Sequence, residues 1–217
     1  MKNKIVPLSV IELSSPKLEG GKTVLKALQQ RKTIREISDK KLSLRVLSAL
    51  LWAAGGVNRK KGPFGISGRT AASASNSQEI DIYTALPEGI YLYSAAGHRL
   101  LPVIGGDFRK LMISARQPGF AWQAPVHLLY VADIDKLSNT SGFQEPGLKD
   151  PEIQKSYYYA DTGLIAGNVS LFAASQGLAS WFHNCNRSAL TEKLKLRVDQ
   201  RVLFAQTVGY AVRKSIK

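Results

Sequence analysis

The stretch from residue 151 to residue 176 constrains the fold of this chain most, because it is the longest segment with a helical pattern. Pro151 stands at its start and Gly177 follows its end, as is typical of helix boundaries. Apolar residues recur at helical spacing at Ile165, Val169, Phe172 and Ala173. Small residues lie between them at Ala160, Gly163, Ala166 and Gly167. Small side chains let a second backbone approach closely, so the stretch predicts a long helix that lies either in a crowded core or at the seam of a dimer.

Alternation of apolar and polar residues predicts strands in the middle of the chain. Residues 80–86 and 89–94 flank a Pro-Glu turn, and residues 98–104 follow a second turn, which predicts a small antiparallel meander. Residues 124–133 are apolar enough for a buried strand. Two more strands are expected near the C-terminus, a short one at LASWF and a final one at 201–212.

Helices are expected before and between these strands. Thr23 is a suitable cap for a helix through about Gln30, and Ser43 for a helix that ends at Gly55-Gly56. Asp107 is a suitable cap for a helix through about Ala115. A short amphipathic helix is expected around Thr191. Residues 57–78, rich in Gly, Ser, Lys and Asn, predict a long ordered loop.

These elements predict one α+β domain over residues 1–217. Its first 20 residues are aperiodic and contain Pro and Ser, which indicates an extended N-terminal arm. Residues 135–150 are a polar excursion suited to a lid. No internal repeat and no composition shift suggests a second domain.

The balance of charge is unusual, since 30 Lys and Arg residues against 16 Asp and Glu residues give a net charge of +14. Such a field attracts polyanions in general, including nucleic acid, anionic lipid and phosphorylated cofactors. The cations are spread along the chain, and no helix-turn-helix, zinc-finger or RNP-type pattern accompanies them. We therefore expect no specific nucleic-acid site, and we keep a non-enzymatic polyanion-binding or nucleic-acid-binding protein as the alternative of a different class.

Cysteine and histidine usage argues against a disulfide-rich protein and a metal enzyme. The single Cys185 cannot form an internal disulfide or a multi-cysteine metal site, and no partner that would activate its thiol is identifiable. His98, His127 and His183 lack ligand spacing and are interpreted as buried structural or surface histidines. No apolar run approaches the roughly 18 residues of a membrane span, so no membrane partner is expected. The lack of a secretory signal favours the cytoplasm, or the periplasm if a signal was trimmed.

Three segments carry residues suited to binding. The segment RKTIR at 31–35 combines cations with a hydroxyl, which together bind phosphate oxygens; a solvated basic turn is the alternative. Residues 68–81 deliver Asn76 and Gln78 before a strand, and their carboxamides suit the mixed edge of a flavin or nucleobase; an ordinary turn is the alternative. Residues 179–190 lead a strand into a loop whose backbone N–H groups could meet an electron-rich ring atom.

Five blocks, in order from about Leu25 to Tyr210, resemble the nitroreductase family, particularly its smaller branch related to azoline dehydrogenases. They are RKTIREISDKKLS, LLWAAGGVNR, RTAASASNSQEIDIY followed by GIYLY, YADTGLIAGNVSLFAASQGL and QRVLFAQTVGY. The resemblance implies an α+β fold with a central, mostly antiparallel sheet flanked by helices, in an intertwined homodimer. It also implies flavin mononucleotide (FMN) at the dimer interface and NAD(P)H as electron donor.

The resemblance further implies a set of cofactor-binding residues: Arg31, Lys32, Thr33, Arg35, Ser73, Ala74, Asn76, Gln78, Asn184, Cys185, Arg213 and Lys214. Arg31 and Thr33, which replaces the usual Ser, would hold the phosphate and ribityl chain, and Arg35 would face the pyrimidine side of the ring. The stretch 73–78 would reach the flavin from the partner subunit, with Ala72 where Pro is usual. Asn184-Cys185 would lie near flavin N5 where Gly is usual, and Arg213-Lys214 near the phosphate.

The implied activity needs no catalytic side chain, because flavin N5 carries the chemistry. NAD(P)H would reduce the flavin and leave, and a nitroaromatic, a quinone or a similar electron-poor small molecule would then take the electrons, which is a ping-pong mechanism. Positive charge from Arg35 would stabilise the reduced ring. The alternative among enzymes is a flavin-dependent azoline-type dehydrogenase, which would oxidise a heterocycle on a peptide; the absence of an obvious peptide-docking domain argues against it.

Overall fold

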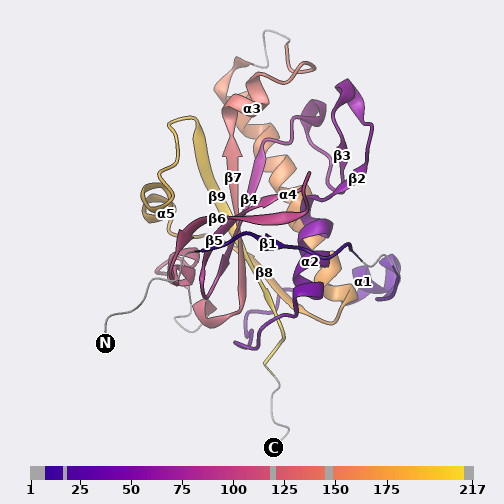
Figure 1. Ribbon diagram of the computed structural model, residues 1–217, viewed down its shortest axis with the longest axis vertical. Helices are drawn as coiled ribbons and strands as arrows, with labels where there is room; N and C mark the ends of the chain where they lie inside the picture. Colours follow the sequence, from indigo (N-terminus) through magenta and orange to yellow (C-terminus); the bar gives the residue numbers. More distant parts are fainter. Residues whose placement is uncertain (1–7, 17–18, 118–120, 145–148, 213–217) are drawn as a thin grey trace, which may run out of the picture.

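The computed structural model describes residues 8–16, 19–117, 121–144 and 149–212. Its centre is a seven-stranded sheet with the strand order β1-β6-β5-β4-β7-β9-β8, and each neighbouring pair is antiparallel. In Figure 1, α1, α2 and α4 gather on one side of the sheet, and α5 lies on the other. This is the α+β fold predicted from the sequence, an antiparallel sheet flanked by helices.

The strands of the sheet are β1 (Ile11–Glu12), β4 (Ile80–Leu86), β5 (Gly89–Ser94), β6 (Arg99–Gly105), β7 (Val126–Asp133), β8 (Ala179–His183) and β9 (Gln200–Gly209). The predicted meander is confirmed, because β4 pairs with β5 and β5 pairs with β6. Strand β7 is buried along its whole length because it lies between β4 and β9 with both faces covered. Its continuous apolar sequence is the consequence of this position.

The helices are α1 (Val24–Gln30), α2 (Leu44–Gly55), α3 (Ile134–Ser138), α4 (Pro151–Ser175) and α5 (Arg187–Lys193). The predicted caps are confirmed, since Thr23 Oγ1 accepts the N–H of Lys26 and Ser43 Oγ accepts the N–H of Val46, both at 3.3 Å. A capping hydroxyl satisfies a backbone donor that the first turn leaves unpaired. Thr23 and Ser43 therefore fix where α1 and α2 begin.

Two predictions about local structure were wrong. Residues 57–78 are not one loop: they form the strands β2 (Val57–Arg59) and β3 (Gly68–Arg69), which pair with each other, and two 3-10 turns, Pro63–Gly65 and Ala74–Asn76. We call residues 57–69 the β2–β3 hairpin. Asp107 caps no α-helix, because its carboxylate binds the backbone N–H and the guanidinium of Arg109. Only a 3-10 turn follows, at Arg109–Met112.

The core has one large apolar cluster on each face of the sheet. On one face α2 and α4 contribute Leu50, Leu51 and Val169, all fully buried. On the opposite face α5 contributes Leu190, which packs with Leu129 and Val131. The helices on both faces therefore bury the sheet, as expected for a layered α+β architecture.

Helix α4 buries one side and leaves the small residues of the other side uncovered. Ile165, Val169 and Ala173 are buried, as the helical spacing predicts. Gly163 and Gly167 are exposed, and a Cβ added at either would meet no atom within 4 Å. The exposed glycine face is therefore free to pack against another molecule. None of the helices in the described part of the chain has the length and apolar character needed to cross a membrane.

The assignment of residues 1–217 to one domain, with an arm over residues 1–20, stays a prediction. Within that arm, Ile11 and Glu12 pair with Leu100 and Arg99 of β6, at the edge of the sheet. Ser14 extends this attachment, since its carbonyl accepts a hydrogen bond from the hydroxyl of Ser48 on α2.

Candidate functional site

The segment 31–35 leaves the end of α1 and is fastened to the C-terminal strands. Ile34 donates its backbone N–H to Ser180 O on β8 at 3.1 Å, and Ser38 donates its N–H to Tyr210 O at 2.8 Å. The side chains of Arg31, Lys32 and Thr33 are exposed. Neither cation forms an ion pair with another residue in the described ranges. The backbone is thus fixed while the polar groups stay available for an anion.

Arg35, the last residue of this segment, and the nearby residues 210–212 lie close to the C-terminal strands. The guanidinium of Arg35 lies 5.8 Å from the ring centre of Trp181 on β8. Val212 donates its backbone N–H to Glu36 O at 3.0 Å, and Ile37 pairs with Ala211, so residues 210–212 run alongside residues 36–38. The remaining predicted residues here, Arg213 and Lys214, lie outside the described residues.

The segment 73–78 has an unusual backbone. Ser75, Asn76 and Gln78 have φ values of 49°, 57° and 53°, in the left-handed region that residues other than glycine rarely adopt. The segment is anchored to α4, because Ala74 donates its N–H to Asp161 Oδ2 at 2.8 Å. Such strain persists only where surrounding contacts hold it, and it is common at functional sites.

The carboxamides of Asn76 and Gln78 brace the β2–β3 hairpin. Asn76 Nδ2 donates to the carbonyls of Pro63, Ile66 and Ser67 at 3.4–3.5 Å, and Gln78 Nε2 donates to Ser67 O at 2.6 Å. Gln78 Oε1 accepts from Arg69 Nε at 2.6 Å. Their amide donors are therefore occupied within the chain. The hydroxyl of Ser73 accepts the N–H of Gln78 at 3.0 Å and keeps its own proton for another acceptor.

One chain does not bring the segments 31–35 and 73–78 together. The start of α1 is attached to the end of α4, where Lys22 donates its N–H to Ser175 O, whereas Ala74 is attached at Asp161. About 20 Å of helix separates Asp161 from Ser175, at a rise of about 1.5 Å per residue. Figure 1 places α1 at one end of α4 and the β2–β3 hairpin nearer the other. A ligand that touches both segments would need a second copy of the chain.

The loop after β8 contains the predicted residues Asn184 and Cys185. Their backbone N–H groups donate no hydrogen bond to any residue that the structure describes, so these donors are available. The thiol of Cys185 is buried in the cluster on the α5 face, and burial raises its pKa to about 11. A thiol with this pKa stays protonated at neutral pH, so Cys185 is unsuited to nucleophilic attack.

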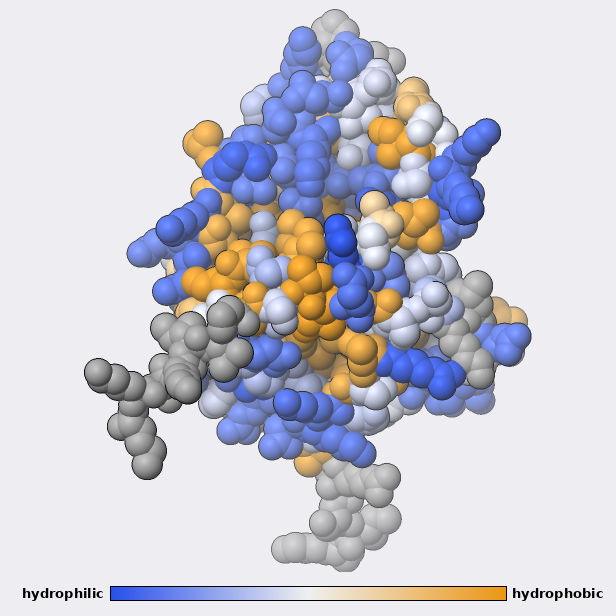
Figure 2. All heavy atoms as spheres, viewed as in Figure 1, coloured by the Kyte–Doolittle hydropathy of each residue, from blue (hydrophilic) through white to orange (hydrophobic). Residues whose placement is uncertain are grey.

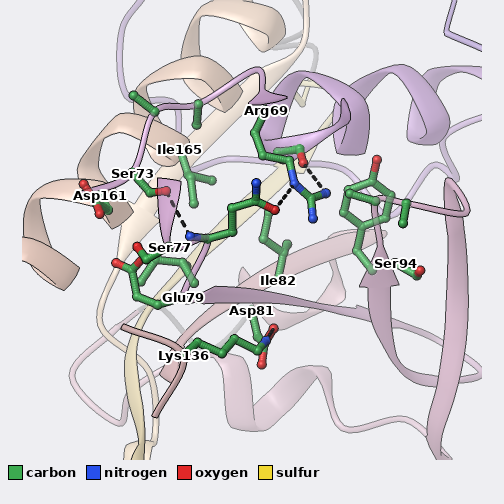
Figure 3. Close-up of a pocket in the computed structure, with 18 residues that line it drawn as sticks. Arg69, Ser73, Ser77, Glu79, Asp81, Ile82, Ser94, Lys136, Asp161 and Ile165 are labelled. Atoms are coloured by element: carbon green, nitrogen blue, oxygen red, sulfur yellow. Dashed lines mark hydrogen bonds and ion pairs between the residues drawn. The ribbon is translucent and has the colours of Figure 1, made fainter. Parts of the chain in front are cut away.

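A cavity of about 330 Å³ lies beside the segment 73–78 and is lined in part by Ser73 and Gln78 (Figure 3). Its wall also holds charged residues that sequence reasoning missed: Arg69, Glu79, Asp81, Lys136 and Asp161. Lys136 Nζ lies 2.6 Å from Asp81 Oδ1. The sequence offered little reason to select these residues. Glu79 belongs to no motif beyond its position after Gln78, and Asp161 is an isolated acid in a long helix.

Glu79 and Asp161 form a buried carboxyl pair at the wall of this cavity. Burial, and next the charge of Asp161, raise the pKa of Glu79 to about 7; burial raises that of Asp161. Ser77 Oγ donates to Glu79 Oε2 at 2.6 Å and partly offsets this rise. The two carboxyl groups interact, so they titrate as a pair, and Glu79 keeps its proton up to near neutral pH.

Replacement of Glu79 by Gln should change how stability depends on pH. The pKa of Glu79 rises from an ordinary 4.5 to about 7 on folding, so the folded protein binds the proton more tightly. The free energy of unfolding that this proton contributes is complete at low pH and is lost as the pH rises through about 7. Relative to the wild type, Glu79→Gln should gain about 2–3 kcal/mol in free energy of unfolding between about pH 5 and about pH 8.

Urea unfolding of both proteins across this pH range measures the difference. Glu152→Gln is the control, because the Glu152 side chain is 78% exposed and should show no such gain. Curves for Glu79→Gln that run parallel to the wild type at every pH would contradict the raised pKa of Glu79.

The rings of all three histidines form hydrogen bonds with other residues of the chain. Thr207 Oγ1 lies 2.9 Å from His127 Nδ1 and 2.7 Å from His183 Nε2. Burial lowers the pKa of His127 to about 3 and that of His183 to about 4, so both rings are neutral at neutral pH. His98 lies between Ser48 and Tyr93. These contacts fit the interpretation of His127 and His183 as buried structural histidines.

Comparison with known proteins gives one consistent result. The model of the nitroreductase family matches residues 28–210. A protein of Methanocaldococcus jannaschii that is assigned as a nitroreductase is 28% identical over 160 residues, which cover 70% of this chain and 74% of that protein.

Solved structures share the fold. A crystal structure from Ralstonia eutropha, also assigned as a nitroreductase, is 33% identical, with a TM-score of 0.83, and the match covers 95% of this chain and 91% of that one. The Escherichia coli microcin synthetase complex contains a chain that is 18% identical with a TM-score of 0.66; 98% of this chain and 80% of that one are covered, and this likeness shows the fold alone. The family match across most of the chain and the close structural match lead to one conclusion: the chain belongs to the nitroreductase family of oxidoreductases.

Proposed function

We propose that this protein is an FMN-dependent oxidoreductase that takes electrons from NAD(P)H and passes them by a ping-pong mechanism to nitroaromatic, quinone or similar electron-poor acceptors. The observation that carries the proposal is the segment 31–35, fastened beside the C-terminal strands, where Arg31, Lys32 and Thr33 are exposed and neither of the first two forms an ion pair with a described residue. Arg31 and Lys32 would bind the phosphate of FMN, with Thr33 as a neutral donor. Its place in the cell, which we expect to be the cytoplasm, stays a prediction.

The donors around the proposed site fit a flavin. Asn184 and Cys185 would offer their free backbone N–H groups to acceptor atoms at the ring edge, and Arg35 would place positive charge near the pyrimidine. FMN, when bound, supplies hydride acceptance and release, which side chains alone cannot provide. The residues of this chain would bind and orient the cofactor and stabilise negative charge. Arg213 and Lys214 would add to the phosphate site.

We further propose that the site forms only in a homodimer. Ser73, Ala74, Asn76 and Gln78 would reach the cofactor of the partner subunit, which accounts for the distance between this segment and residues 31–35 along α4. Because the amide donors of Asn76 and Gln78 are occupied, the Ser73 hydroxyl is the side-chain donor left for such a contact. The uncovered glycine face of α4 is the surface we assign to the seam.

The visible spectrum of the purified protein tests the proposal first. We expect a yellow protein, or a colourless one that takes up FMN stoichiometrically, and bleaching on anaerobic titration with NADH or NADPH. Reoxidation by a nitroaromatic or a quinone should then restore the colour. A protein that binds no flavin when FMN is offered in excess would contradict the proposal, and steeply salt-dependent DNA binding by that colourless protein would favour the polyanion-binding alternative.

A further inference from the structure

The β2–β3 hairpin carries exposed side chains that the site described so far does not use. Arg59, Lys60 and Lys61 are consecutive and exposed, and none forms an ion pair with another residue in the described part of the chain. Phe64 and Ile66, a few residues on, are 56% and 41% exposed. In Figure 2 hydrophilic and hydrophobic residues lie next to one another on the side of the molecule that carries this hairpin. Unpaired cations beside an exposed aromatic ring form a surface with two distinct binding groups.

The exposed aromatic ring and its backbone contact other parts of the chain. Phe64 has a φ of 57°, and Gly65 has a φ of 74°. A bulky residue adopts this left-handed backbone conformation only where contacts from other residues stabilise it. The Asn76 carboxamide supplies it by binding the carbonyls of Pro63 and Ile66 on either side. The ring also lies against Gly142, where an added Cβ would be 2.5 Å from a ring atom.

This combination suits a phosphorylated nucleoside. Guanidinium and ammonium groups bind phosphate oxygens through charge-assisted hydrogen bonds. An exposed aromatic ring stacks on a nucleobase, and a ring that already has contacts within the chain loses less conformational entropy on binding. The hairpin offers three exposed cations and one exposed aromatic ring, enough for a single nucleotide. A nucleic-acid strand would need successive stacking rings along a groove.

We propose that the β2–β3 hairpin binds the adenosine 2′-phosphate end of NADPH, so that NADPH is the preferred electron donor over NADH. The inference rests on the proposed function, which requires a nicotinamide donor. The 2′-phosphate is the one group that distinguishes NADPH from NADH, and basic side chains are the usual means of recognising it. The hairpin is braced by Asn76 and Gln78, so it lies beside the segment assigned to the cofactor site, where a donor must dock.

Binding of two small nucleotides tests the inference without turnover. 2′,5′-ADP carries the 2′-phosphate and 5′-AMP does not. In calorimetry the wild type should bind 2′,5′-ADP at least about tenfold more tightly, and Lys60→Gln/Lys61→Gln should abolish this difference. Phe64→Ala should weaken both nucleotides by about the same factor, about tenfold, because it removes stacking only.

The matched control is Lys193→Gln/Lys195→Gln. This variant loses the same charge from exposed positions at α5, on the opposite side of the molecule from the hairpin in Figure 1. It should keep the wild-type preference for 2′,5′-ADP. A control that lost the preference equally would show a general effect of net charge and would overturn the assignment to the hairpin.

Turnover separates this inference from the proposed function. In steady-state kinetics Lys60→Gln/Lys61→Gln should lower kcat/KM for NADPH about tenfold and leave that for NADH unchanged. Flavin reduction by NADH with no preference for NADPH would overturn the hairpin inference and leave the proposed function intact. A single-stranded oligonucleotide that bound through Lys60 and Lys61 when 2′,5′-ADP did not would also overturn it. Selective 2′,5′-ADP binding by a protein that takes up no FMN would support the hairpin site and contradict the proposed function.

Discussion

Replacement of Arg31 by Ala is expected to weaken FMN binding about 10- to 100-fold, because it removes a charge-assisted phosphate contact worth about 1.5–3 kcal/mol. Arg31 is exposed at the end of α1, and the backbone that follows is held by the hydrogen bond from Ile34 to Ser180. The loss should therefore act on binding and leave the fold intact. Titration of apoprotein with FMN, followed by quenching of flavin fluorescence, measures the dissociation constant.

Two companion variants make the result specific. Arg31→Lys keeps the charge but lacks the planar fork of donors, so it should recover part of the lost affinity. Arg45→Ala removes the same charge from an exposed position on α2 and should bind FMN as the wild type does. Wild-type affinity in Arg31→Ala would remove this residue from the phosphate site.

The elements that the sequence predicted well are those in which one periodic signal extends over several residues. Strands β4 and β5 begin and end where the alternation predicts, at 80–86 and 89–94, because Pro87 and Glu88 separate two well-patterned runs. Helix α4 was predicted equally well, since Pro151 and Gly177 mark its two ends and apolar residues recur at helical spacing from Ile165 to Ala173. Long periodic segments leave few alternative pairings, so local pattern suffices there.

The short elements were missed for the opposite reason. Strands β2 and β3 are three and two residues long, too short for alternation to be visible in a stretch rich in Gly and Lys. At Asp107 the residue type suits a helix cap, but its carboxylate binds the nearby guanidinium of Arg109. Competition between a backbone and a side-chain partner depends on geometry that residue type does not reveal.

The candidate site shows the same limit at the level of single side chains. The sequence singled out Asn76 and Gln78 as donors and acceptors, but not that their amides bind the carbonyls of residues 63–67. Likewise Glu79 and Asp161 meet only because β4 and α4 lie side by side, more than 80 residues apart in the chain. Such pairs are consequences of tertiary packing, and no local pattern encodes them.

The sequence left open whether the small residues of α4 serve a crowded core or a dimer seam, and the exposure of Gly163 and Gly167 favours the seam. Gly167→Trp tests this. Gly167 is exposed, a Cβ added there meets no atom within 4 Å, and glycine is a poor helix former, so the monomer should keep its fold and stability. At a closely packed seam the ring should raise the dimer dissociation constant at least about 100-fold.

The shared-site proposal gives this variant a second consequence. If each cofactor is held by residues 31–35 of one chain and 73–78 of the other, Gly167→Trp should lose FMN together with the dimer, although it touches neither segment. Sedimentation measures the association, flavin absorbance the cofactor, and circular dichroism the fold. Glu192→Trp adds the same ring at an exposed position of α5 and should change none of them. A Gly167→Trp dimer that keeps its flavin would exclude this face of α4 as the seam, whereas a folded monomer that keeps flavin would show that one chain suffices for the site.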